Sequence, residues 1–307
     1  MNIKNYLKIN KISLKKLSVA CDIPYPTLNK ALKNPESIKI VNFKRIAKYL
    51  GLSLDELYEL FFQRESKILN ALIEQKKIKL SGNLYYYTQI QFAYNSNRIE
   101  GSKLTEDETR MLYDTNTLLD VKGVPVDDVF ETANHFHLFN VMLDEIDNDL
   151  SEEIIKKYHE ILINGTSASY KEWFNVGEYK ALANEVGGNS TTSPEKVEFE
   201  IKTLFVWYSI LGNKKIEDLI EFHYRFEKIH PFQDGNGRIG RMILFRECLK
   251  NNIVPFIITG EYKAYYYKGL FEFREEAGYL MDTSLLMQDN YKAMCLKFLN
   301  IEENELV

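Results

Sequence analysis

The chain contains 307 residues, of which 45% are hydrophobic and 27% are charged, and its formal net charge is −5. This composition excludes a chain that is disordered throughout, and the length predicts one sizeable core and a second domain. The net negative charge argues against a nucleic-acid-binding surface that extends over the whole chain. Because no apolar run approaches the roughly 18 residues of a membrane span and no secretory signal is recognisable, we expect a cytoplasmic protein. The three cysteines, Cys21, Cys248 and Cys295, are isolated in the sequence and are expected to be reduced.

Positive charge is concentrated at the N-terminus. Residues 1–60 contain eleven Lys or Arg and five Asp or Glu, a net charge of +6, which leaves −11 for the remainder. Ser13 is placed to cap a helix that follows it, and Pro26 suits the first position of the next helix, 27–32. Residues 38–50 and 53–62 predict two more amphipathic helices. A separate helical module is therefore expected over 1–62.

This module resembles a helix-turn-helix domain of the λ-repressor-like class. The resemblance implies that DNA is a partner and that the second helix enters the major groove. The side chains that this helix would present to DNA are Tyr25, Thr27, Asn29, Lys30 and Lys33. The alternative is a small helical bundle for dimerisation or docking, whose lysines only keep it soluble.

A helix is predicted over 90–101, after a break at 81–83. Gly101 ends this helix in the manner of a C-cap glycine. Ser96 and Glu100 lie four residues apart and therefore share one face of the helix.

Residues 230–241 combine a base, a carboxylate, glycines and arginines in one loop and helix start. His230 falls at the end of an apolar helix that Pro231 stops, and a second helix begins near Arg238. Gly235 and Gly237 allow close approach of the backbone to an anion at the N-terminus of this helix, where Asn236 adds a neutral donor. Arg238 and Arg241, three residues apart, predict two guanidinium groups that point the same way and bind phosphate oxygens.

The two remaining groups of the loop predict a cation and a proton acceptor. Asp234 would be repelled by bare phosphates unless a hard cation such as Mg²⁺ lay between them. His230 is the only group of the loop that can take a proton near neutral pH. A solvated surface turn is the alternative interpretation, but it leaves this combination of seven residue types unexplained. No other nucleotide-binding loop of the Gly-x-x-x-x-Gly-Lys-Ser/Thr type occurs in the sequence.

The string from His230 to Arg241 resembles the signature of the Fic family, His-Pro-Phe-x-Asp/Glu-Gly-Asn-Gly-Arg-x-x-Arg, at every fixed position. The resemblance implies a mainly α-helical Fic fold with a small β-hairpin flap, and an enzyme that transfers AMP from ATP to a Ser, Thr or Tyr hydroxyl of a protein. It implies His230 as catalytic base, Asp234 as the Mg²⁺ ligand and a nucleotide site. That site would consist of Phe232, Gly235, Asn236, Gly237, Arg238, Arg241 and Tyr266.

Other segments are similar to further parts of the family. Ser96 and Glu100 match its inhibitory helix, which implies that Glu100 pairs with Arg241 in the space of the γ-phosphate and misplaces the α-phosphorus. Residues 182–195 are expected to form the flap, which can align a target by strand addition. Gly177-Glu178-Tyr179-Lys180 stands where the family commonly has Gly-x-Tyr-Arg, so Lys180 is a departure. The tyrosines at 262 and 265–267 match adenine-contacting positions or, alternatively, pack in the core.

The sequence thus predicts a helix-turn-helix domain over 1–62 and a Fic domain over 63–307. Two other functions remain open: Glu100 could activate water to remove AMP from a target, or the chain could be a DNA-binding regulator that modifies itself. A homodimer is possible. No zinc site is expected, since His135 and His137 cannot chelate together from a regular helix and His159 and His223 fit hydrogen-bonded core positions.

Overall fold

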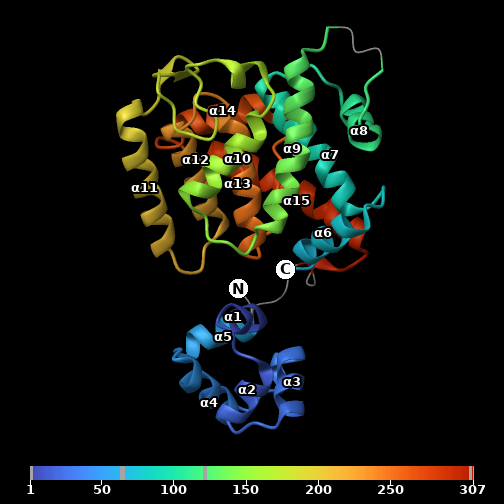
Figure 1. The fold of residues 1–307 in the computed structure, drawn as a ribbon, viewed down its shortest axis with the longest axis vertical. Helices are drawn as coiled ribbons and strands as arrows, with labels where there is room; N and C mark the ends of the chain where they lie inside the picture. The colour runs from blue at the N-terminus through green and yellow to red at the C-terminus, as the bar shows by residue number, and fades with distance from the viewer. Residues whose placement is uncertain (1–2, 63–65, 120–122, 304–305, 307) are drawn as a thin grey trace. The chain divides into compact units, whose positions relative to one another are not determined.

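The computed structural model describes residues 3–62, 66–119, 123–303 and 306, and the chain divides into two compact units, Met1–Glu65 and Ser66–Val307. Each unit has its own hydrophobic core. The predicted mainly α-helical architecture with a small hairpin is confirmed (Figure 1). The domain ranges expected from sequence stay a prediction.

The first unit is built from short helices around a core that includes Leu17, Leu28 and Ile46. Its elements are α1 (Ile3–Ile9), α2 (Leu14–Ala20), α3 (Tyr25–Lys33), the 3₁₀ turn η1 (Pro35–Ser37), α4 (Ile40–Leu50) and α5 (Leu54–Phe62). Ser13 caps α2 as predicted, because its hydroxyl accepts a hydrogen bond from the Lys16 N–H. Helix α3 begins two residues earlier than expected, since Pro24 is already its N-cap residue.

The second unit contains the remaining helices and one hairpin. Its elements are α6 (Lys67–Ile78), α7 (Leu84–Glu100), α8 (Glu106–Thr115), α9 (Val126–Asp144), α10 (Glu152–Ile163), η2 (Ser167–Tyr170), β1 (Glu185–Val186), β2 (Asn189–Ser190), α11 (Pro194–Ile210), α12 (Ile216–Ile229), α13 (Asn236–Lys250), η3 (Gly260–Tyr262), α14 (Lys263–Glu272) and α15 (Gly278–Leu299). The strands pair antiparallel, with Glu185 opposite Ser190. This hairpin lies within the predicted flap, 182–195.

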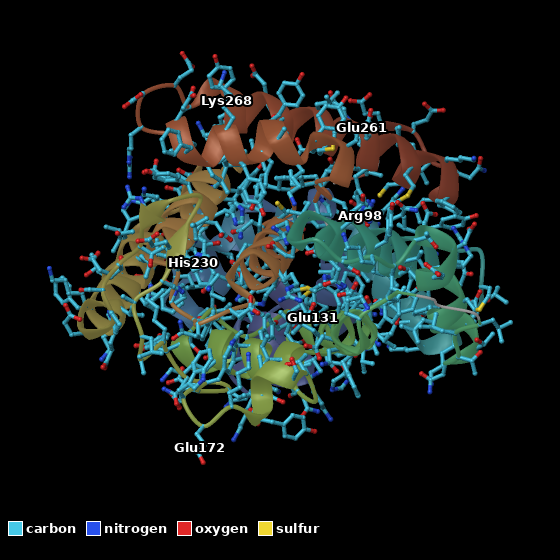
Figure 2. The ribbon with its side chains drawn as sticks, turned by 90° about the horizontal axis from the view of Figure 1, so that it is seen from above. Arg98, Glu131, Glu172, His230, Glu261 and Lys268 are labelled. Carbon is cyan, nitrogen blue, oxygen red and sulfur yellow. The ribbon has the colours of Figure 1, made fainter. Side chains whose placement is uncertain are left out.

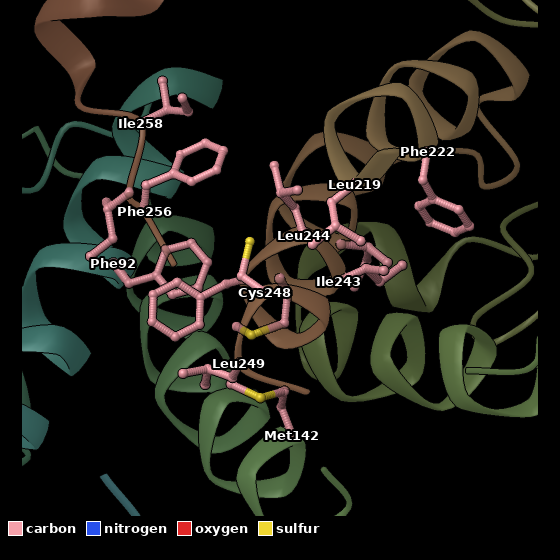
Figure 3. Packing of buried hydrophobic residues seen from close by; sticks show 14 of the residues in the cluster. Phe92, Met142, Leu219, Phe222, Ile243, Leu244, Cys248, Leu249, Phe256 and Ile258 are labelled. Carbon is pink, nitrogen blue, oxygen red and sulfur yellow. The ribbon is translucent and has the colours of Figure 1, made fainter. Parts of the chain in front are cut away.

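Helix α13 is the central helix of the second unit. Nearly every residue from Asn236 to Leu249 is buried, and the helix packs against α7, α9, α10 and α12. Figure 3 shows its side chains Ile243, Leu244 and Cys248 among those of neighbouring helices, including Phe92 and Met142. Because it is covered on all sides, every polar group that α13 carries must find its partner inside the protein.

Helix α7 begins earlier than the sequence indicated. The side chain of Asn83 accepts a hydrogen bond from the Tyr86 N–H and caps the helix, so the helix starts directly after the break at 81–83. It ends at Gly101, which has φ 107°, a left-handed conformation that favours glycine. The length of α7 carries Ser96 and Glu100 across the core to α13.

Two further expectations concern cysteines and the membrane. Cys21, Cys248 and Cys295 are all buried free thiols. Within the described ranges, the structure has no helix that combines the length and the apolar character needed to cross a bilayer.

Close packing of α14 on α15 predicts a stability defect. A Cβ at Gly269 would lie 2.7 Å from the backbone of Leu280, whereas a Cβ at Gly212 would meet nothing within 4 Å. We therefore expect Gly269→Ala to lower the free energy of unfolding by about 1–3 kcal/mol, the usual cost of overpacking, and Gly212→Ala to leave it nearly unchanged. Urea denaturation followed by circular dichroism measures both; equal stability of the two variants would contradict this packing.

Candidate functional site

The loop between α12 and α13 is held in its shape by two left-handed residues. His230 ends α12 with φ 52°, and Gly235 precedes α13 with φ 77°. The first turn of α13 therefore starts within the signature loop, and its free N–H groups point out of the helix end, where an anion binds favourably.

Asn236 organises this loop from within. Its side-chain oxygen accepts a hydrogen bond from the Phe232 N–H at 2.7 Å, and its amide group donates to the Phe232 carbonyl at 2.8 Å. One N–H of the Asn236 amide is thus used within the loop, and its second N–H remains for the expected contact with phosphate, which stays a prediction.

Phe232, which the resemblance implies as a nucleotide contact, lies in the core of this structure. Its ring is fully buried and stacks on His159, with centroids 4.2 Å apart and planes 3° from parallel. The ring thus anchors the loop to α10 and presents no surface to a ligand. His159 in turn accepts a hydrogen bond from the Gly177 N–H, as expected for a core histidine.

Arg241 is buried and bonded to the last turns of α7. Its Nε donates to Ser96 Oγ at 3.1 Å, and its Nη2 donates to the Ser96 carbonyl at 2.9 Å and to Glu100 Oε1 at 2.6 Å. Nη1 has no hydrogen-bond partner among the residues that the structure describes. The guanidinium group also lies 5.8 Å from the ring centroid of Tyr266.

Arg238 is equally buried but pairs with a different helix. Its guanidinium contacts the carboxylate of Glu131, on α9, and lies 3.6 Å from Asp234 Oδ1. No motif in the sequence distinguishes Glu131, which is one of several acidic residues in α9. The two signature arginines therefore reach different neighbouring helices.

Gly237 leaves the space that the Glu100 carboxylate occupies. A Cβ at this position would overlap Glu100 Oε1 and would lie 2.9 Å from Arg241 Nη1. The absence of a side chain at Gly237 thus allows an anion, here a carboxylate, to approach the first turn of α13.

The two acids of the site differ in their protonation. Burial raises the pKa of Glu100, but the charges of Arg241 and Arg238 outweigh burial and hold this pKa below its usual value. Burial also raises the pKa of Glu131, and the charge of Arg238 offsets this only in part, so its pKa stays above the usual value. Glu100 is therefore the firmly ionised carboxylate of the pair.

His230 is neutral at pH 7. Burial, followed by the charge of Lys180, lowers the pKa of His230 to about 4. Its ring nitrogens are thus free of the extra proton and one of them can accept a proton.

Lys180 links the hairpin segment to the end of α12. Its ammonium group donates to Asn184 Oδ1 at 2.7 Å, to Thr191 Oγ1 at 2.6 Å and to the Ile229 carbonyl at 3.5 Å. All three acceptors are neutral, and desolvation lowers the pKa of Lys180 to about 8. The departure from arginine therefore still yields a residue that holds the flap.

A cavity of about 520 Å³ lies between the hairpin, α12 and α14. Val186 and Thr191 line it from the flap side, Glu227 from α12, and Tyr267 and Lys268 from α14. Figure 2 shows Lys268 on the helix at the upper edge of the view, with His230 and Glu131 deeper in the molecule.

Tyr266 does not line this cavity. It is fully buried, and its hydroxyl bonds to His223 Nε2 at 2.7 Å. The neighbouring Tyr267 faces the cavity instead, because adjacent residues of a helix point in different directions.

The described residues contain no group of three or more His, Cys, Asp or Glu that could hold a metal ion. Asp234, the expected Mg²⁺ ligand, has a side chain that is 56% exposed and stands beside the first turn of α13. His135, on α9, is fully buried against Phe92 of α7.

In the N-terminal unit, α3 presents a polar outer face. Tyr25, Thr27 and Lys30 are exposed and Asn29 is half-buried, whereas Leu28 and Ala31 face the core. The side chain of Lys33 lies outside the described residues.

Comparison with known proteins identifies both parts of the chain. Residues 149–247 match the Fic/DOC family and residues 2–63 match the Cro/C1-type helix-turn-helix DNA-binding domain. The chain is similar to protein adenylyltransferase fic-1 of Caenorhabditis elegans, at 25% identity over 60% of this chain and 36% of the relative. It is similar to protein adenylyltransferase Fic of Nematostella vectensis at 27% identity, over 59% of this chain and 42% of the relative. The chain thus spans less than half the length of these curated relatives.

Solved structures show the same fold. A Fic-domain-containing signalling protein from Bacteroides thetaiotaomicron matches 76% of this chain and 94% of its own, with a TM-score of 0.56 and 25% identity. Fic-1 from C. elegans matches 95% of this chain and 86% of its own, with a TM-score of 0.57 and 16% identity. Residues 149–247 of the chain are thus similar to the Fic/DOC family, and residues 2–63 in front of them are similar to the Cro/C1-type helix-turn-helix domain.

Proposed function

We propose that this protein transfers AMP from ATP to a hydroxyl group of a protein, either a target or itself. The observation that carries the proposal is that the neutral His230 lies next to the N-terminus of α13. This helix end combines glycines, which leave space for an anion, with two buried arginines. The names of the adenylyltransferase relatives support the same reaction.

The phosphates of ATP fit the first turn of α13. The backbone N–H groups near Gly235 and Gly237 and the macrodipole of the helix favour negative charge there. Arg238 and Arg241 supply buried positive charge on the same helix. Arg241 would meet the γ-phosphate in the space above Gly237, and Arg238 would support the diphosphate.

The residues present also fit a magnesium ion. Mg²⁺ in nucleotide sites is usually held by one or two carboxylates together with the phosphates of the substrate, so a cluster of three acidic ligands is not needed. Asp234 offers an exposed carboxylate next to the phosphate site. When bound, Mg²⁺ would neutralise part of the phosphate charge and make the α-phosphorus easier to attack.

His230 would act as general base. A neutral imidazole takes the proton of the target hydroxyl while the oxygen attacks the α-phosphorus, and the bond to the bridging oxygen breaks so that pyrophosphate leaves. The anionic nucleotide would raise the pKa of the neighbouring His230 towards neutrality, which strengthens the base once ATP is bound.

The nucleoside would occupy the cavity beside the hairpin, against Tyr267. A cavity of about 520 Å³ is within the size range of small-ligand sites. The hairpin that closes one side of this cavity would align the target segment by strand addition, held in place by Lys180.

Glu100 would keep the enzyme in a resting state. Its carboxylate bonds to the arginine expected to bind the γ-phosphate. ATP that enters beside this pair would present its α-phosphorus out of line with the incoming hydroxyl. Breaking a fully buried ion pair from one side costs about 3–5 kcal/mol, and the cost is smaller here because the Glu100 side chain is 31% exposed, but it still favours the resting state.

The base assignment predicts the effect of His230→Ala. We expect AMP transfer to fall by about 10²–10⁴, the usual contribution of a general base, with ATP binding nearly unchanged. Incubation with α-labelled ATP, Mg²⁺ and a cell lysate measures transfer, and calorimetry measures binding. The matched control is His137→Ala, an exposed histidine of α9, which should label as wild type does. Normal labelling by His230→Ala would contradict the assignment of His230 as the general base.

The proposed inhibition by Glu100 predicts the effect of Glu100→Gly. We expect labelling to rise by about tenfold or more, since a tenfold change needs only about 1.4 kcal/mol of the energy that a buried ion pair holds. Arg241→Ala should not reproduce this gain, because it removes the phosphate anchor together with the pair. The double variant should be as inactive as Arg241→Ala alone, as expected of residues that share one site.

The same variant separates AMP transfer from AMP removal. If Glu100 activates water for removal, Glu100→Gly should also lose the ability to clear AMP from a modified target. Equal labelling by wild type and Glu100→Gly, with no clearance by either, would show that Glu100 has no regulatory role.

We further propose that the N-terminal unit binds duplex DNA through α3. The observations that favour this are the exposed polar face of α3 and the net charge of +6 within residues 1–60. When binding is driven by phosphate contacts, the logarithm of the affinity falls linearly with the logarithm of the salt concentration.

Lys30→Ala tests the DNA interface in the full chain. If Lys30 contacts a phosphate, the slope of log affinity against log salt should fall by about 1, whereas Lys196→Ala, an exposed lysine of α11, should leave it unchanged. Fluorescence anisotropy with a labelled duplex at several salt concentrations gives both slopes. Identical slopes for the two variants would favour a dimerisation or docking module instead.

A further inference from the structure

Glu227 is a buried acid that the proposed reaction does not use. It lies on α12, one helical turn before His230. Its Oε1 is buried and has no hydrogen-bond partner, whereas the residue as a whole is half-buried because it also lines the cavity beside the hairpin. A buried polar atom without a partner is costly and points to a ligand or a proton that satisfies it.

Gly240 makes the room for this carboxyl group. A Cβ at Gly240 would overlap Glu227 Oε1, just as a Cβ at Gly237 would overlap Glu100 Oε1. The two glycines are three residues apart and therefore lie on one face of α13. The spaces beside Gly237 and Gly240, the two slots, lie about one helical turn apart on α13. Each slot is filled by a carboxyl group from a different helix.

Arg241 lies next to both slots. It follows Gly240 directly, it is bonded to Glu100, and its Nη1 has no partner. The arginine interacts electrostatically with both Glu100 and Glu227. In the absence of phosphate, the guanidinium group of Arg241 therefore lies close to two acidic side chains, Glu100 and Glu227.

The groups packed around Glu227 leave it neutral at pH 7. Burial raises the pKa of Glu227 to about 8; the charge of Arg241 from α13 lowers it, and the charge of Glu100 from α7 raises it further. From α14, Tyr266 and Tyr267 face it as neutral phenols, since burial raises the pKa of both hydroxyls, that of Tyr267 to about 12.

The remaining titratable neighbours lie on α12, on the cavity wall and under the flap. His223, also packed against Gly240, is neutral because burial lowers its pKa to about 3. His230 is neutral for the reasons given above, while Lys180 has a pKa of about 8 and Lys268 lines the same cavity as Glu227. Glu227 and Lys180 are therefore the two groups of this neighbourhood that change charge between pH 7 and 9.

We propose that Glu227 is a specificity-determining residue of the nucleotide site: as a neutral acid it admits the terminal phosphate of a nucleoside triphosphate to Arg241, and as a carboxylate it excludes it. The inference rests on the proposed function, since it takes the α13 N-terminus to be the phosphate site. A neutral carboxyl group donates a hydrogen bond to a phosphate oxygen. An ionised one repels the phosphate and competes for the same guanidinium group.

Glu100→Gly removes the first carboxylate and so exposes the effect of the second. We expect the affinity of this variant for Mg²⁺-ATP, measured by calorimetry, to fall about five- to tenfold between pH 8 and pH 9, because binding then requires that Glu227 take up a proton. Heats measured in buffers of different ionisation enthalpy should show the uptake of close to one proton at pH 9. The affinity for Mg²⁺-ADP, which lacks the terminal phosphate, should change little.

The matched variants separate Glu227 from Lys180 and from general effects of pH. Glu100→Gly with Glu227→Gln keeps Lys180 and should bind Mg²⁺-ATP equally at pH 8 and pH 9, without proton uptake. Glu100→Gly with Glu217→Gln, an exposed acid of the same helix, should behave as Glu100→Gly alone.

Three results would overturn the inference. The first is an affinity of Glu100→Gly for ATP that does not change with pH, and the second is the same fall in the variant that also carries Glu227→Gln. Both leave the proposed function intact. The third is the absence of ATP binding by Glu100→Gly at every pH, which would overturn the proposed function together with the inference.

Discussion

The burial of the guanidinium groups of Arg238 and Arg241 in the first turns of α13 constrains the rest of the second unit. Helix α13 is covered on all sides, so Arg238 and Arg241 cannot be solvated and must each find an anion inside the protein. Glu131 from α9 and Glu100 from α7 supply these anions. Since removing one partner of such a pair leaves an uncompensated buried charge, the pairs fix how α7 and α9 pack on α13.

The same constraint explains how a site can be both stable and ready for a ligand. A buried ion pair gives little net stability compared with well-packed apolar residues, so its presence favours a role other than folding. In the proposed site, exchanging the carboxylate for a phosphate would keep Arg241 paired throughout, since the arginine is already desolvated. The proposed competition between Glu100 and a phosphate would then be decided by the difference between two anions in one place.

The sequence predicts the parts of this site that depend on local rules. Turn glycines, the proline after His230 and the spacing of Arg238 and Arg241 are legible along the chain, as are the capping residues of α2 and α7. Contacts between distant helices are not. Nothing near Glu131 or Glu227 distinguishes them from surface acids, and the burial of Phe232 and Tyr266 follows from packing against His159 and His223, which lie far away in the sequence.

Lys180 connects the geometry of the flap with the chemistry of the base. Its ammonium group bonds to Asn184 and Thr191 on the flap side and to the carbonyl before His230. Burial lowers the pKa of His230 most, and the positive charge of Lys180 lowers it further. Any movement of the flap that carries Lys180 away from α12 would therefore release the hairpin segment and also raise the pKa of His230, so that both properties depend on a single side chain.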